Sequence, residues 1–205
     1  MQEIKETTSY RQSLKSRILD TAIRAFAERG VRAVKMDDVA QALGISKRTL
    51  YEIYEDKETL LYQGIIKYDQ QRKERMRQYA DSHNVMDVIL YAYAQKVEQS
   101  QHVSPQFYTD LQKYPRVLKY LEQEHAATRE YFHEFLQRGV REGYFRKDVN
   151  YDLLPHLFEA IGRYVAERGL LTDYSFQELF GSFLLVPLRG FCTKKGLQII
   201  EKADF

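Results

Sequence analysis

Apolar residues recur at helical spacing along almost the whole chain, and this periodicity restricts the fold more than any other feature of the sequence. Only 4 prolines and 10 glycines interrupt the 205 residues, and no segment alternates convincingly as a half-buried strand does. In residues 13–29, for example, Leu14, Ile18 and Phe26 lie on one face of a helix. Gly30 follows as a stop signal. We therefore predict an all-α protein.

The composition is that of an ordinary folded protein with a sizeable core. Hydrophobic residues make up 44% and charged residues 29%, which argues against a disordered or membrane-embedded chain. No apolar run approaches the roughly 18 residues that span a bilayer, and the first residues lack the apolar stretch of a signal peptide. The single cysteine, Cys192, suits a reducing compartment. These features predict a cytoplasmic location and no membrane partner.

The expected helices are short near the N-terminus and longer after it. They cover residues 13–29, 36–43, 47–54, a fourth from 57 onward, 86–101, 105–112, 115–142, 153–168 and 176–194. Ser46 and Asp56 are suitable N-caps for the third and fourth helices. We predict an N-terminal domain of residues 1–57 and a C-terminal helical domain of residues 58–205, with the boundary at the fourth helix.

Two of the short helices, residues 36–43 and 47–54, form a helix-turn-helix pattern. Val39 and Leu50 supply apolar contacts between them. Gly44 can adopt the positive φ that a sharp turn after a helix requires, and Ile45 fills the space beneath the turn. The N-terminal domain is therefore predicted to be a three-helix domain with a helix-turn-helix.

The outward face of the second of these helices carries Lys47, Arg48, Tyr51 and Glu52, which suits insertion into a DNA major groove. Arg48 or Lys47 can donate to guanine O6 and N7. Thr49 or Tyr51 can contact phosphates or a thymine methyl group. Ser46 and the helix start favour a phosphate, and Lys57 can hold the DNA backbone across the groove. The alternative is an ordinary solvated charged face.

Charge distribution favours the same part of the chain. The net charge is only +2, but residues 1–50 carry ten Lys or Arg against six Asp or Glu. The remaining residues have a slight acidic excess. This asymmetry fits a nucleic-acid-binding head on a nearly neutral body.

Residues 18–61 resemble the DNA-binding domain of the tetracycline-repressor (TetR) family. The segments "ILDTAIRAFAERG" and "MDDVAQALGISKRTLYEIYEDKETLL" follow its pattern A-x-x-F-x-x-x-G and I-A-x-x-x-G-V-S-x-x-x-L-Y-x-x-F-x-x-K-x-x-L. Lys35 stands where the family usually has a threonine that caps the second helix and touches phosphate. A lysine can still contact phosphate but cannot accept the capping bond. Tyr54 replaces the usual phenylalanine.

The resemblance implies a homodimer, most simply a repressor, that binds a palindromic operator in double-stranded DNA. It also implies that a small molecule releases the protein from the DNA. It also implies that the two C-terminal helices form the dimer interface and that the C-terminal domain holds the ligand. The apolar segments "LLPHLFEAIGRYV" and "FQELFGSFLLVPLRGF" fit such an interface, where Gly162 and Gly181 would permit close approach. Aromatic residues between 91 and 135 suit either a ligand or a simple core, so we assign no ligand residues.

Nothing in the sequence supports catalysis, a cofactor or a metal site. The five histidines are scattered, and His125 and His133 lie two helical turns apart, beyond the one-turn spacing of paired ligands. No phosphate loop or nucleophile elbow appears. Two alternatives remain: a helical module whose C-terminal domain responds to a protein partner, and an all-helical enzyme with an incidental helix-turn-helix.

Overall fold

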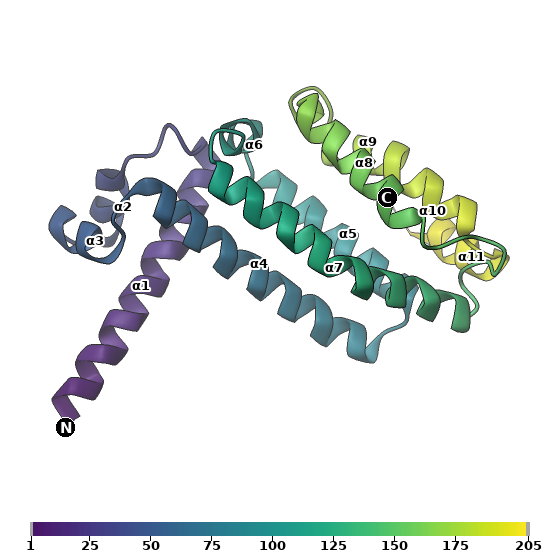
Figure 1. The fold of residues 1–205 in the computed structure, drawn as a ribbon, viewed down its shortest axis with the longest axis horizontal. Coiled ribbons are helices and arrows are strands. Elements are labelled where there is room, and N and C mark those ends of the chain that lie inside the picture. Colours follow the sequence, from purple (N-terminus) through teal and green to yellow (C-terminus); the bar gives the residue numbers. More distant parts are fainter. Residues whose placement is uncertain (1, 204–205) are drawn as a thin grey trace. The chain divides into compact units, whose positions relative to one another are not determined.

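The computed structural model describes residues 2–203 and is helical throughout (Figure 1). Within that range the only β-type pairing is an isolated antiparallel bridge between Phe145 and Cys192. The elements are α1 (Gln2–Arg29), α2 (Met36–Leu43), α3 (Lys47–Ile53), α4 (Lys57–Ser82), α5 (Val85–Gln101), α6 (Pro105–Leu111), α7 (Pro115–Arg141), α8 (Leu154–Glu167), η1 (Leu170–Thr172), α9 (Phe176–Leu179), η2 (Phe180–Leu185), α10 (Val186–Phe191) and α11 (Lys194–Lys202). The all-α prediction is confirmed. No helix in residues 2–203 is long and apolar enough to cross a membrane.

Capping side chains start α3 and α4 at the residues predicted from the sequence. The Ser46 hydroxyl accepts a hydrogen bond from the Thr49 N–H at 3.0 Å, and the Asp56 carboxylate accepts one from the Thr59 N–H at 2.6 Å. The bond from Thr59 also lowers the pKa of Asp56. Both predicted N-caps are confirmed.

Two expectations about the ends of the chain are wrong. Helix α1 begins at Gln2, so residues 2–12 continue the helix expected from residue 13. The single helix expected over residues 176–194 is divided into α9, a π-helical segment and α10. Pro187 in α10 has no N–H to donate, which weakens a regular α-helical ladder at this point.

Helix α11 follows an extended residue, Cys192, which ends α10 with φ −74° and ψ 147°. The Thr193 hydroxyl then accepts from the Gly196 N–H at 3.3 Å and starts the new helix. A Cβ at Gly196 would lie only 2.6 Å from the Tyr144 carbonyl oxygen, so glycine allows α11 to pack closely. This helix was not predicted from the sequence, because the helix expected over residues 176–194 extended into its first residue. Asp204 and Phe205 lie outside the described residues.

The chain divides into two compact units that differ from a simple division by sequence. One contains residues 1–73 and 102–119, and the other contains residues 74–101 and 120–205. Helix α6 and the start of α7 therefore belong to the same unit as the helix-turn-helix. The boundary between residues 57 and 58 remains our proposal for where the functional domains divide.

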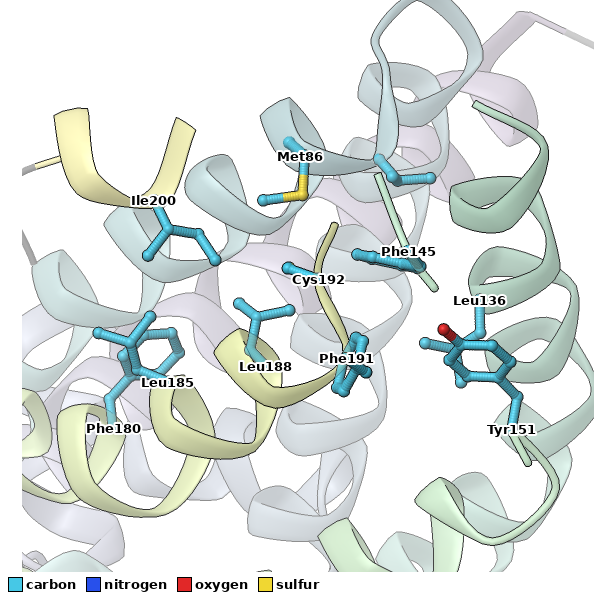
Figure 2. Close-up of a cluster of buried hydrophobic side chains, with 11 residues drawn as sticks. Met86, Leu136, Phe145, Tyr151, Phe180, Leu185, Leu188, Phe191, Cys192 and Ile200 are labelled. Carbon is cyan, nitrogen blue, oxygen red and sulfur yellow. The ribbon is translucent and has the colours of Figure 1, made fainter. Parts of the chain in front are cut away.

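The second unit has its own apolar core, drawn in Figure 2. Phe145 is 1% exposed and packs edge-to-face on Phe191, with ring centroids 5.1 Å apart. A Cβ at Gly139 in α7 would lie 2.0 Å from the Phe145 ring, so only glycine fits beneath it. Gly139 therefore lies inside α7 and serves packing.

Candidate nucleic-acid interface

The α2–α3 hairpin is fixed by a small apolar core of its own. Val39 is 1% exposed and Leu50 is fully buried. Gly44 has φ 64° and ends α2, and the Ile45 N–H donates to the Ala40 carbonyl at 3.0 Å. This is the left-handed helix ending that the sequence predicted. The turn thereby sets the direction in which α3 leaves it.

Helix α3 presents the predicted polar face to the surface. Lys47, Arg48, Tyr51 and Glu52 are all exposed, and Tyr51 has 42% of its surface accessible. Leu50 on the opposite face and Tyr54, the residue that ends α3, are buried. The structure thus brings together three of the predicted DNA-contacting residues, Lys47, Arg48 and Tyr51, on one outward face.

Both cations of this face are paired with carboxylates. The Lys47 ammonium lies 2.9 Å from each oxygen of Asp37, and this bond raises the pKa of Lys47. The Arg48 Nε donates to Glu52 Oε1 at 2.8 Å. Neither carboxylate partner was predicted from the sequence. The i,i+4 spacing could have indicated the second pair, whereas Asp37 lies ten residues before Lys47 and gives no such signal.

Ser46, Thr49 and Lys35 lie at helix starts. Besides capping α3, the Ser46 hydroxyl lies 2.8 Å from the Thr49 hydroxyl. Lys35 is the exposed N-cap residue of α2, and its N–H donates to the Asp38 carboxylate at 2.9 Å. That bond is one half of a capping box, in which the side chain of the third helical residue accepts from the N-cap N–H. The lysine side chain cannot accept the bond that would form the other half. Phosphate contacts by these three residues remain predictions.

Lys57 has a different environment from the one expected. Its ammonium is half-buried and donates to the carbonyl oxygens of Val31 and Val34, at 3.0 and 3.1 Å. It therefore holds the turn between α1 and α2 from inside the unit. A role for Lys57 on the DNA backbone stays a prediction, and such a contact would compete with these bonds.

A segment from the middle of the chain also braces this turn. Fully buried Asp110 in α6 accepts hydrogen bonds from the Arg32 N–H and the Gln106 side chain, both at 2.8 Å. The Ser104 N–H donates to the Ala27 carbonyl at 2.8 Å. Sequence reasoning missed this group because no local pattern links residues almost eighty positions apart. Among the described residues, no cluster of His, Cys, Asp and Glu could hold a metal ion.

Known proteins with similar sequences are transcriptional regulators. The family described as "Bacterial regulatory proteins, tetR family" matches residues 18–63. The HTH-type transcriptional repressor KstR2 of Mycobacterium tuberculosis is 30% identical over 196 residues, covering 90% of this chain and 96% of the relative. This chain belongs to the TetR family.

Solved structures agree with the fold of this TetR-family chain. A transcriptional regulator from Saccharomonospora viridis, solved in complex with choline, superposes with a TM-score of 0.70 at 17% identity, covering 89% of this chain and all of the other. The ketosteroid transcriptional regulator KstR2 of M. tuberculosis superposes with a TM-score of 0.50 at 24% identity, covering 88% and 95%. The protein is a DNA-binding transcriptional repressor, and it is not an enzyme.

Proposed function

We propose that this TetR-family regulator reads its operator with the exposed face of α3, using Lys47, Arg48 and Tyr51. The observation that carries the proposal is the outward placement of these side chains on a helix whose other side is anchored by buried Leu50. Base edges in the major groove accept from arginine and lysine, while phosphate contacts fix the register. Lys35, Ser46, Thr49 and Lys57 are the proposed phosphate-side residues. The site of action is the cytoplasm.

The proposed dimer interface lies on α8 together with the α9–α10 segment. None of the 14 residues of α8 is buried, although this helix is rich in apolar residues. Leu153, Leu157 and Tyr164 are 62%, 42% and 50% exposed and fall on one stripe of the helix. Val186 at the start of α10 is 60% exposed. Apolar area of this kind is what a self-complementary two-fold interface covers.

The effector is proposed to act through the C-terminal helical domain. The relatives guide the choice of test compounds, since one solved regulator is described with choline and another as a ketosteroid regulator. A steroid ketone and a quaternary ammonium compound are therefore the first two arms of a ligand screen. A protein partner acting on the same domain is the alternative.

A mobility-shift experiment tests the DNA-binding part of this proposal. The full-length protein is titrated onto the duplex that flanks its own gene and onto a shuffled duplex, across a series of salt concentrations. Lys47→Ala/Arg48→Ala is the test variant, and Glu201→Gln, exposed on α11, is the control. We expect specific binding that weakens steeply with salt, because phosphate contacts release counterions, and that is lost in the test variant. Equal binding of the test variant and the natural protein would refute the assignment of α3.

A further inference from the structure

We propose that Glu52 is a specificity-determining residue of α3, which positions Arg48 for a guanine and itself accepts a hydrogen bond from a neighbouring cytosine. The proposal rests on the proposed function, because it requires α3 to lie in the major groove. It adds a carboxylate to a surface otherwise described by its cations.

The hydrogen bond between Arg48 and Glu52 uses only part of each side chain. Glu52 Oε1 accepts from Arg48 Nε at 2.8 Å. This bond involves neither Nη atom of the guanidinium, and the Nη atoms are the donors that can form a fork on guanine O6 and N7. A carboxylate accepts through both oxygens, so Glu52 Oε2 can bond a cytosine N4 amino group while Oε1 holds the arginine.

The spacing of Arg48 and Glu52 along α3 suits base pairs that lie close together. Arg48 and Glu52 are four residues apart, so they occupy one face of α3 and differ by about 6 Å in height. Successive bases of a strand are separated by about 3.4 Å, so the two side chains reach base pairs that are one or two steps apart. Their side chains are 89% and 57% exposed, which leaves both accessible to DNA.

The stability of α3 does not account for a glutamate at position 52. It is the penultimate residue of α3, where a negative charge opposes the helix dipole. The order of the pair, with arginine N-terminal to glutamate, is also the less favourable one for an i,i+4 ion pair. An exposed pair of this kind changes an equilibrium by only about 1.5- to 5-fold. A role in recognition explains the carboxylate better than a role in folding.

A glutamate at this place also acts against wrong sequences. Guanine and thymine present oxygen or nitrogen acceptors in the major groove, and these repel a carboxylate. Binding to a wrong site therefore leaves Glu52 desolvated and unpaired, in addition to any lost contact of Arg48. Discrimination of this type arises from a penalty on the competitor as well as from attraction to the operator.

Asp37→Asn provides a matched control for Glu52→Gln. Asp37 belongs to the other ion pair of the same surface, with Lys47, and its side chain is 55% exposed, close to the 57% of Glu52. Each substitution removes one negative charge and weakens one ion pair. A generic charge effect appears in both variants. A change at a base position next to the one read by Arg48 is expected in Glu52→Gln alone, because only Glu52 lies on α3 beside Arg48.

The experiment measures base preference with the full-length protein. The operator duplex and all of its single-base-pair variants compete for binding to the natural protein, Glu52→Gln, Arg48→Ala, the combined variant and Asp37→Asn. Circular dichroism confirms that each variant is folded. For the natural protein, a wrong base pair at the position read by Glu52 lowers affinity by about 5- to 150-fold.

We expect Glu52→Gln to lose the preference for cytosine at one position in each half-site, within two base pairs of the position that Arg48→Ala affects. In the Arg48→Ala background the same change has a smaller effect on the arginine-read position, because its positioning role is already gone. Asp37→Asn raises affinity and leaves the base preference at these positions unchanged. A uniform change in Glu52→Gln, matching Asp37→Asn, would overturn the proposal. A natural protein without any base preference would instead refute the proposed function itself.

Discussion

The carboxylate of Asp110 in α6 accepts a hydrogen bond from the backbone N–H of Arg32, 78 residues earlier in the chain, at 2.8 Å. Asp110 is fully buried, and the Gln106 amide donates to its second oxygen at 2.8 Å. Arg32 lies in the turn that joins α1 to the helix-turn-helix. A residue outside the predicted DNA-binding domain thus fixes the backbone of the turn that precedes the helix-turn-helix.

Replacing Asp110 with alanine should destabilise the unit that contains the helix-turn-helix. The Arg32 N–H and the Gln106 amide would lose their acceptor in a buried site, at a cost of about 1–3 kcal/mol in the free energy of unfolding. Asp110→Asn retains one carbonyl oxygen and should cost less. Urea unfolding measures both variants. Equal stability of Asp110→Ala and the natural protein would contradict the role assigned to this carboxylate.

Gly30→Ala should be more harmful than Gly44→Ala, although both glycines have positive φ, 84° and 64°. A Cβ at Gly30 would lie 2.8 Å from Cγ of Gln106 in α6, whereas nothing lies within 4 Å of a Cβ at Gly44. Gly44→Ala should cost about 1 kcal/mol from backbone strain alone, and Gly30→Ala about 2–4 kcal/mol. Comparison of the two unfolding curves tests the close approach of α6.

Lys57→Met separates the observed role of this residue from its predicted role. Loss of the bonds to Val31 and Val34 should lower the free energy of unfolding by about 1.5–3 kcal/mol. If Lys57 also binds phosphate, the slope of log affinity against log salt becomes shallower by about 0.9. An unchanged slope would confine Lys57 to the α1–α2 turn. Lys35→Met, at an exposed position, serves as the comparison and should change the slope with little loss of stability.

Leu157→Glu should weaken the dimer. The substitution occurs twice in a two-fold interface and places two carboxylates in an apolar contact, so we expect a loss of about 3 kcal/mol or more in association. Light scattering after gel filtration measures the oligomeric state. Ala166→Glu, exposed on another side of α8, is the control and should leave the dimer intact. A dimer unaffected by Leu157→Glu would place the interface elsewhere.

Cys192 should react slowly with alkylating reagents in the native protein. Burial raises the pKa of its thiol from 9.0 to about 11. At pH 8 this leaves about a thousandth of the thiol ionised in place of about a tenth, so alkylation by iodoacetamide should be about 100-fold slower than after unfolding. Because ionisation is favoured in the unfolded chain, the protein should lose stability as the pH rises from 9 toward 11. Rapid labelling at pH 8 would contradict this environment.

Much of the α2–α3 hairpin could be predicted because its signals are local. Gly44, Ser46 and Asp56 act on residues one helical turn away, and buried Leu50 follows from helical periodicity. The outward direction of Lys47 and Arg48 follows from the same periodicity. Their pairing with Asp37 and Glu52 was not predicted, since ion pairs on a surface depend on rotamers and on the angle between two helices.

Local signals in the amino-acid sequence are enough to predict that this protein is helical, where its short helices begin, and that α3 exposes a basic and aromatic face. These properties depend on φ and ψ preferences, caps and periodicity, which act over a few residues. Three features became visible in the folded chain alone: α6 belongs with the helix-turn-helix, Lys57 is turned inward, and α11 follows a break at Cys192. Those features arise from burial and hydrogen bonds between residues far apart in the chain, for which the sequence carries no local signal.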